Sequence, residues 1–375
     1  MANLLHLKTS SNSSMNLAFG PPASSSASIS GPHNAAAELW REHLQPSDMA
    51  RTSATPNTTY NTRGSAADIG TSAGAGSQPT AATEPPTLVG QTINGYYFEG
   101  VIELGGCARV YRVRKDGVLY AAKVSLHTAS DDSFAVRTWV NEYAVLRSID
   151  HENIIKAYDL FRCNMKMFMI MEYFEAYDMV YFIRNFSVKW RQENLKPIAK
   201  QIMAGLNHLH NNNIVHRDIK PENILIGSGN EVKIIDFGGA IRLQQQQTPE
   251  DRHVTCSTSY FAPPEMHRGD ARATSNAWIK SFDMWSTGVT LYTALAGRYP
   301  FPLGSDRKIK SSVFDQGPDF GVLGQIDTKL LSLMKRCLDT NPEGRITAKR
   351  AMHHRYFWRG AVDVISSGLF QCFGK

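Results

Sequence analysis

Between residues 91 and 174, short apolar runs alternate with polar turns along the chain. The runs GYYFEGVIEL, VYRVRKDGVLYAAKVSL and MFMIMEYF are rich in β-branched and aromatic residues, which is typical of antiparallel strands. Within the second run, the tripeptide KDG favours a tight hairpin turn. The segment DDSFAVRTWVNEYAVLRSI has the spacing of an amphipathic helix, with three candidate N-terminal caps: Asp131, Asp132 and Ser133.

Beyond residue 174 the hydrophobic pattern changes from strand-like to helical. Apolar residues recur at helical spacing on one face of the segment LKPIAKQIMAGLNHLH: Ile198, Ile202, Leu206 and Leu209. After Phe282 the pattern is mainly helical, with GRYPF as a loop. We therefore expect an α+β fold of two lobes, an N-lobe at about 91–173 and a C-lobe at about 174–358, with a cleft between them.

The two ends of the chain differ from this central part. Residues 1–90 are rich in Ser, Thr, Ala and Pro and poor in aromatic residues, so they cannot bury enough apolar surface to offset the entropy of ordering. We expect this region to be disordered, and residues 359–375 to form a C-terminal tail that packs on the larger lobe or frays. Three interpretations of residues 1–90 stay open: a regulatory tail, a plastid transit peptide, or the secretion leader of a bacterial effector.

Charge and cysteine content exclude several classes of protein. The net charge of +6 is spread along the chain without a run of five or six like charges, so no nucleic-acid-binding arm is indicated. The five cysteines are far apart and form no CxxC, which argues against a disulfide framework or zinc site. No apolar run reaches about 18 residues, so we expect no membrane span. The expected location is cytoplasmic, with a host cell or a plastid as the alternatives.

The stretch IVHRDIKPENILI carries the first candidate chemistry. It places Asp218, Lys220 and Asn223 close together between apolar flanks. A polar surface loop would explain these residues, and so would a loop that transfers a phosphoryl group. In the second interpretation, Asp218 orients the attacking hydroxyl, Lys220 stabilises the phosphoryl group and Asn223 holds Mg²⁺. Asp236, at the end of the apolar run in VKIIDFGGA, would supply a second oxygen ligand to the metal.

Two further stretches meet the demands of a nucleotide. Gly105 and Gly106 in IELGGCARVY could let backbone N–H groups approach phosphates, although a bulged hairpin explains them equally well. Lys123 lies in the predicted strand YAAKV, where a solvated lysine would be ordinary. Glu142, however, lies near the mostly apolar face of the predicted helix, and a carboxylate there needs a cation.

These stretches together resemble a known family. VHRDIKPEN and IIDFGG are similar to the catalytic-loop and metal-binding motifs of eukaryotic-type protein kinases. Five further stretches follow in the family's order. The αC region is resembled by NEYAVLRSIDHENIIKAYDLF, the hinge by MIMEYFEAYDM and the end of the activation segment by TSYFAPPEM. The later helices are resembled by SFDMWSTGV and CLDTNPEGRITA. The resemblance covers about residues 96–358 and implies a two-lobe protein kinase fold that uses ATP and Mg²⁺.

The resemblance also implies roles for the nucleotide-binding residues. Lys123 would pair with Glu142 and contact the α- and β-phosphates. Glu172 and Phe174 would offer hinge backbone groups to the adenine, and Asp178 would contact the ribose. A further set resembles the apolar residues around the base, although for most of them plain core packing would serve as well: Ile102, Val110, Ala121, Met179 and Leu225.

Other residues resemble the family's internal supports. Asp283 would anchor the backbone of the catalytic loop, and Glu265 with Arg345 would form a buried structural ion pair. Three residues resemble members of the apolar spine of the active state: Leu146, His216 and Phe237.

The substrate class and regulation also follow from the resemblance. Lys220, two residues after Asp218, and Thr258 match the serine/threonine-directed pattern, so the implied partner is a protein substrate with a Ser or Thr acceptor. Arg217 indicates a switch by phosphate in the activation segment, added by an upstream kinase or by autophosphorylation. Three residues are candidates for that phosphate: Thr248, Thr255 and Ser257. A segment ordered without phosphate is the alternative.

The glycine-rich loop departs from the family's pattern. Glu103 stands where the first glycine is usual, and Ala108 where the third is. A negative charge near a triphosphate is unfavourable, so we expect weaker ATP binding. The main hypothesis is therefore a serine/threonine protein kinase that functions in signalling. The alternative is a catalytically weak pseudokinase scaffold; the complete TSYFAPPE segment disfavours a small-molecule kinase.

Overall fold

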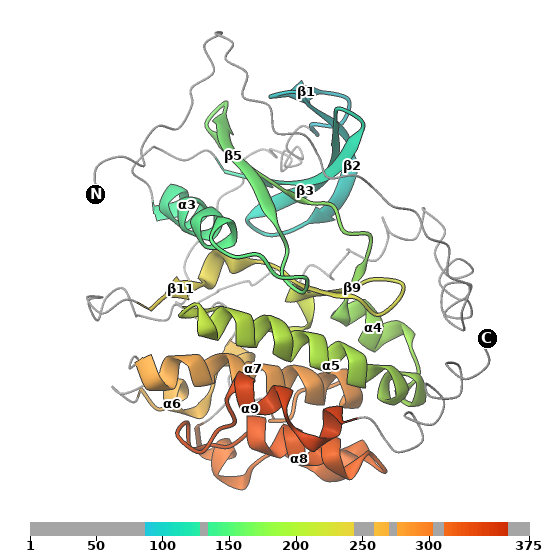
Figure 1. Cartoon of the computed structure of the whole chain (residues 1–375), viewed down its shortest axis with the longest axis vertical. Helices are drawn as coiled ribbons and strands as arrows, with labels where there is room; N and C mark the ends of the chain where they lie inside the picture. Colours follow the sequence, from blue (N-terminus) through green and yellow to red (C-terminus); the bar gives the residue numbers. More distant parts are fainter. Residues whose placement is uncertain (1–86, 128–133, 244–258, 270–275, 303–310, 359–375) are drawn as a thin grey trace, which may run out of the picture.

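The computed structural model describes residues 87–127, 134–243, 259–269, 276–302 and 311–358. A strand-rich lobe with one long helix lies above a helical lobe in Figure 1. This arrangement confirms the predicted α+β fold of two lobes. Several predictions concern residues outside the described ranges. They are those for residues 1–86, for the C-terminal tail, for the caps of the first helix and for the candidate phosphorylation sites. Residues 87–90 were expected to be disordered, but they form a turn in which the Gly90 N–H donates to the carbonyl of Phe98 at 2.9 Å.

A six-stranded antiparallel sheet forms the N-lobe in the order β1-β2-β3-β4-β6-β5. Its strands are β1 Thr92–Ile93, β2 Tyr96–Leu104, β3 Ala108–Lys115, β4 Val118–Ser125, β5 Ala157–Cys163 and β6 Lys166–Glu172. The predicted KDG hairpin is present: Asp116 has a φ of 51° and Gly117 a φ of 78°. Positive φ at both central residues is the requirement of a type I′ turn, whose twist matches that of paired strands.

The sheet has two different faces. One face buries an aromatic cluster, in which Phe98 contacts Tyr111 and Phe168 edge to face. On the other side, α3 (Phe134–Arg147) packs against β5 and β6 and buries Glu142 together with Val145 and Leu146. Glu142 therefore faces the interior from a helix that is otherwise anchored by apolar side chains.

The C-lobe is built on α5 (Val188–Asn211), which packs against α7 (Asn276–Ala296) and α9 (Ala348–Met352) (Figure 1). The four apolar residues predicted on one face of α5 are all fully buried. The helix begins earlier than the predicted segment because the Ser187 hydroxyl accepts from the Trp190 N–H and caps it. The other α-helices of the described ranges are α4 Met179–Asn185, α6 Pro264–His267 and α8 Thr328–Cys337.

Two small sheets lie between the lobes and carry the loops of interest. The first pairs β7 (Tyr177–Asp178) with β9 (Ile224–Ile226) and β10 (Val232–Ile234), and the second pairs β8 (Ile214–Val215) with β11 (Ile241–Arg242). Residues 216–223 connect β8 to β9, and residues 235–240 connect β10 to β11, so both loops start and end on paired strands. Among the described helices, none combines the length and the apolar character needed to cross a bilayer.

Candidate active site

Lys123 connects the two lobes at the centre of the site. Its Nζ lies 2.8 and 2.9 Å from the two carboxylate oxygens of Glu142 on α3, and 3.0 Å from Oδ1 of Asp236 in the loop after β10. The ammonium group also lies over the ring of Trp139, whose centroid is 5.5 Å from Nζ. The structure therefore brings together three residues that the sequence predicted to act on one nucleotide.

The charges of Lys123 and Asp236 stabilise each other, whereas burial raises the pKa of Glu142. Burial alone would lower the pKa of Lys123, but the carboxylates of Glu142 and Asp236 outweigh it and raise the pKa. Burial would likewise raise the pKa of Asp236, but the ammonium group of Lys123 holds it below its ordinary value. Lys123 is therefore a cation and Asp236 an anion at neutral pH, the states that binding to a metal–triphosphate requires.

The catalytic-loop candidates also converge. The Lys220 Nζ donates to Oδ2 of Asp218 at 2.8 Å. The Asn223 side-chain amide donates to the backbone carbonyl of Asp218 at 2.7 Å and to its Oδ2 at 3.0 Å. These bonds fix the Asp218 carboxylate between a cation and an amide, so its orientation is set before any substrate arrives.

Asp283 of α7 holds this loop from below, as the resemblance implied. One of its oxygens accepts from the backbone N–H of Arg217 at 2.8 Å, and the other accepts from the His216 N–H at 3.0 Å. His210 Nε2 lies 2.9 Å from the second oxygen. Arg217 has a φ of 65°, an unfavourable value for a side chain of its size. Two hydrogen bonds to one buried carboxylate stabilise that backbone conformation.

The loop that carries the metal-ligand candidate Asp236 is fixed to α3 by a residue that the sequence analysis did not single out. The Asn141 side-chain amide donates to the carbonyl of Ala240 at 3.0 Å. Within this loop, Asp236 has a φ of 61°. The ring of Phe237 contacts the ring of His216, with 4.6 Å between their centroids, so the loop contacts both α3 and the residues after β8. The sequence carried no local signal for this contact, because residues i and i+1 of a helix project about 100° apart and Asn141 therefore does not share a face with Glu142.

The hinge shows a second contact that sequence reasoning missed. The Glu172 carboxylate at the end of β6 binds Lys233 of β10, with Nζ to Oε1 at 2.8 Å. This ion pair crosses from the N-lobe to the C-lobe beside the predicted adenine site. Among the described residues, the backbone N–H and carbonyl of Phe174 make no hydrogen bond, which leaves them available to a base.

The residues expected around the base, and Asp178, expected at the ribose, differ in how far they are buried. Val110, Leu225 and Asp178 are half-buried, and Ile102 is exposed on β2. Ala121 is buried on β4. Met179, in contrast, lies fully inside the main apolar core. Its position therefore agrees with core packing rather than with a position on the lining of the base-binding site.

The glycine-rich turn takes the form of a hairpin. The Gly105 N–H donates to the carbonyl of Ala108 at 3.0 Å and closes the turn between β2 and β3. A Cβ at Gly105 would lie 3.0 Å from that carbonyl, which is very close, whereas a Cβ at Gly106 would meet nothing within 4 Å. The close approach explains a glycine at 105, and the role of both residues in binding phosphates stays a prediction.

The metal-ligand candidates suit Mg²⁺ in their donor atoms. The amide nitrogen of Asn223 is committed to Asp218, so its Oδ1 is the free end, and Asp236 offers the oxygen that does not face Lys123. Magnesium prefers a few oxygen ligands of this kind and completes its shell with water and phosphate oxygens. Within the described ranges, no group of three or more His, Cys, Asp or Glu residues is arranged to hold a metal by protein ligands alone.

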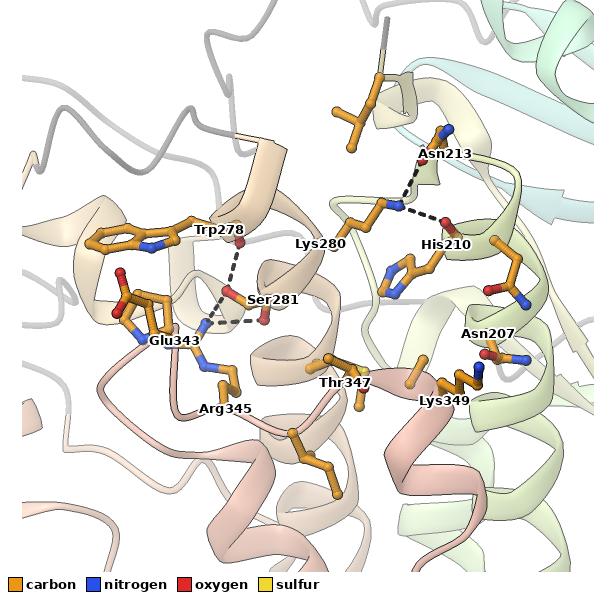
Figure 2. Close-up of a pocket in the computed structure, with 16 residues that line it drawn as sticks. Asn207, His210, Asn213, Trp278, Lys280, Ser281, Glu343, Arg345, Thr347 and Lys349 are labelled. Atoms are coloured by element: carbon orange, nitrogen blue, oxygen red, sulfur yellow. Dashed lines mark hydrogen bonds between the residues drawn. The ribbon is translucent and has the colours of Figure 1, made fainter.

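A cavity of about 750 Å³ lies elsewhere, in the C-lobe between the end of α5, the start of α7 and residues 342–349 (Figure 2). None of the predicted catalytic, nucleotide-binding or metal-binding residues lines it. Lys280 donates to the His210 carbonyl at 2.7 Å and to Asn213 at 2.8 Å, and Arg345 donates to Ser281. These polar groups of the cavity lining thus form hydrogen bonds within the C-lobe. The candidate active site is therefore the group of interlobe residues and not this cavity.

The two-lobe fold, the interlobe Lys–Glu–Asp network and the Asp–Lys–Asn loop define the class of proteins with the active-site arrangement of protein kinases. Comparison with known proteins agrees: the family model of the protein kinase domain matches residues 96–357. The chain belongs to the protein kinase domain family.

Similar proteins carry the same kind of domain. The chain is 30% identical to the serine/threonine-protein kinase cds1 of Schizosaccharomyces pombe over 249 residues, which are 64% of this chain and 53% of the relative. It is 30% identical to the CBL-interacting serine/threonine-protein kinase 3 of Arabidopsis thaliana over 58% of this chain and 47% of the relative. It is 27% identical to the serine/threonine-protein kinase PLK4 of Drosophila virilis over 75% of this chain and 35% of the relative. The chain thus spans about half or less of the length of these curated relatives.

Proposed function

We propose that this protein is an ATP-dependent serine/threonine protein kinase that transfers the γ-phosphoryl group to hydroxyls of protein substrates. The observation that carries the proposal is the interlobe network, in which Lys123 binds both Glu142 and Asp236 while Asp218 is fixed nearby by Lys220 and Asn223. A pseudokinase scaffold would not need all of these residues in contact.

Each side chain has a separate part in the reaction. The ammonium group of Lys123 binds the α- and β-phosphates, and Glu142 keeps it in position. Asp218 orients the substrate hydroxyl and accepts its proton as the new P–O bond forms and the bond to ADP breaks. Lys220 stabilises the negative charge on the phosphoryl group during transfer. When bound through Asn223 and Asp236, Mg²⁺ supplies charge neutralisation of the phosphate oxygens.

The serine/threonine class is supported by Lys220 and by the names of the relatives. Phosphorylation of Thr255 or Ser257, by an upstream kinase or by the protein itself, remains part of the proposal. Arg217 supports it, because an arginine beside the catalytic aspartate can pair with such a phosphate. A role in signalling and a cytoplasmic location are proposed on the same family likeness.

The test compares the full chain with Asp218→Asn in Mg·ATP and a generic protein substrate. We expect phosphate incorporation to fall by at least about 100-fold in the variant, because the base that orients the hydroxyl is lost. Phosphoamino-acid analysis of the wild-type product should give phosphoserine and phosphothreonine. Asp150→Asn, on the surface beside Lys156, is the matched control and should keep full activity.

Equal incorporation by wild type and Asp218→Asn would contradict the enzyme proposal. One observation favours the second candidate, a pseudokinase scaffold. Glu103 lies on β2 beside the glycine-rich turn, and the pKa of its carboxyl is raised, by desolvation first and then by the charges of Asp178 and Asp236. Nucleotide binding without phosphate transfer in the wild-type chain would support that candidate.

A further inference from the structure

The pairing of β2 with β3 determines the direction of Glu103. Glu103 pairs with Val110 on β3, and Val110 pairs in turn with Lys123 on β4. Residues that lie directly opposite one another in antiparallel strands project from the same face of the sheet. Lys123 reaches Asp236 from that face, so Glu103 also projects into the nucleotide cleft.

A bulge in β2 is responsible for this direction. Val101 pairs with Tyr111 and Glu103 pairs with Val110, so Ile102 is the extra residue in the strand. Without this shift Glu103 would pair with Arg109 and its side chain would lie on the opposite face. The bulge therefore turns a carboxylate toward the place where the phosphates would bind.

The electrostatic surroundings agree with this geometry. Glu103 is exposed at the end of β2, but desolvation of its carboxyl, followed by the negative charges of Asp178 and Asp236, raises the pKa of that group, while Lys123 opposes the shift. Within the described residues no cation lies within ion-pair distance of Glu103, whereas Glu99 on the same strand binds Arg112 at 3.0 Å. In the part of the chain that the structure describes, the Glu103 carboxylate is thus a negative group without a direct ion pair, and it interacts unfavourably with the carboxylates of Asp178 and Asp236.

We propose that Glu103 makes nucleotide binding selective for the metal complex over metal-free ATP. The inference rests on the proposed function, since it assumes that the cleft binds a triphosphate. A carboxylate repels a ligand in proportion to the negative charge of that ligand, and one Mg²⁺ cancels about two of the charges on a triphosphate. The repulsion is therefore strongest for the unproductive metal-free nucleotide.

A direct binding measurement on the full chain tests this role without relying on catalysis. Isothermal titration calorimetry would measure the Kd of ATP in EDTA and, separately, in saturating Mg²⁺. We expect Glu103→Gln to tighten binding of metal-free ATP by roughly tenfold and of Mg·ATP by at most about threefold, because the amide removes the charge and keeps the shape. Glu193→Gln, an exposed carboxylate of α5, makes the same change in net charge outside the cleft and should alter neither Kd.

Three outcomes would overturn the inference. An equal change in both Kd values would show that Glu103 does not discriminate by ligand charge. Weaker binding of both forms by Glu103→Gln would show that the carboxylate accepts a ribose hydroxyl, and loss of that effect with 2′,3′-dideoxy-ATP would identify the contact. Absence of nucleotide binding by every form of the chain would overturn the proposed function as well, whereas wild-type binding with equal Kd changes would overturn the Glu103 inference alone.

Discussion

Two networks of buried charges in this protein have similar members and different surroundings. In the C-lobe, the Arg345 guanidinium binds the Glu265 carboxylate at 2.8 and 3.0 Å and also donates to the Ser281 carbonyl. In the cleft, Lys123 binds Glu142 and Asp236 at comparable distances. The side chain of Arg345 is 0% exposed, whereas that of Asp236 is 43% exposed.

This difference indicates which network can act on a ligand. Around Arg345, protein groups surround the charges, and the Trp285 ring covers the guanidinium at 5.1 Å. Such a network can stabilise the fold but offers no free atom to a substrate. Around Lys123 one end opens to solvent, so a ligand can replace water there. The burial of an ion pair is thus weak evidence of function, and its open end is stronger evidence.

The largest expected effect comes from the open end of the cleft network. Asp236→Asn removes the proposed metal-ligating carboxylate, and we expect kcat to fall by about 10³-fold, because charge neutralisation of the phosphates is lost. The half-exposed position means that stability should change by only about 1 kcal/mol. Steady-state kinetics with Mg·ATP and a thermal melt of the same preparation would measure the two effects.

Asp150→Asn is the control for this variant, since it removes a surface carboxylate paired with Lys156. If Asp236→Asn lowered the free energy of unfolding by about 4 kcal/mol, as much as Arg345→Met is expected to do, the distinction between the two networks would be lost.

The closed network should show the opposite pattern. Arg345→Met leaves the buried Glu265 carboxylate without its partner, and we expect the free energy of unfolding to fall by about 4 kcal/mol. The activity of the molecules that remain folded should change little at low temperature. Urea denaturation followed by tryptophan fluorescence, with activity normalised to the folded fraction, would measure both. Full stability in this variant would show that the ion pair contributes nothing to the fold.

The smallest effect concerns the pH dependence of the Asp283 anchor. Burial would raise the pKa of Asp283, but the hydrogen bond from His210 holds it below its ordinary value. A carboxyl with a lowered folded pKa stabilises the fold fully above its unfolded pKa of about 3.9, and this contribution is lost as the pH falls through the folded value. We expect Asp283→Asn to be less stable than wild type by about 2 kcal/mol at pH 7. The difference should narrow below about pH 4.

Urea titrations of both proteins from pH 7 to about pH 2 would test this dependence, because the difference changes only below the ordinary pKa of the carboxyl. A difference that stays constant over the whole range would show that the ionised form of Asp283 has no special role.

Local sequence was sufficient to predict much of the candidate site. Asp218, Lys220 and Asn223 lie within six residues, and the structure shows them in contact with one another. The buried face of α5 followed from helical spacing alone. The pairing of Lys123 with Glu142 required the family resemblance, because a strand and a helix had to be brought together.

Contacts between distant segments were beyond the reach of the same reasoning. The Glu172–Lys233 pair crosses between the lobes, and each residue alone looks like an ordinary surface charge. The direction of Glu103 depends on one extra residue in β2, and a shift of one position in a strand reverses its faces. The sequence of the turn does not reveal which strand carries the bulge.

The contact between Asp283 and the backbone of Arg217 has a consequence for biosynthesis. The two residues are 66 positions apart, so Asp283 leaves the ribosome well after the loop whose conformation it stabilises. A nascent chain that ends before α7 lacks the carboxylate that holds the positive φ of Arg217. The growing polypeptide therefore acquires the hydrogen bonds that stabilise this loop only after most of the domain has been translated.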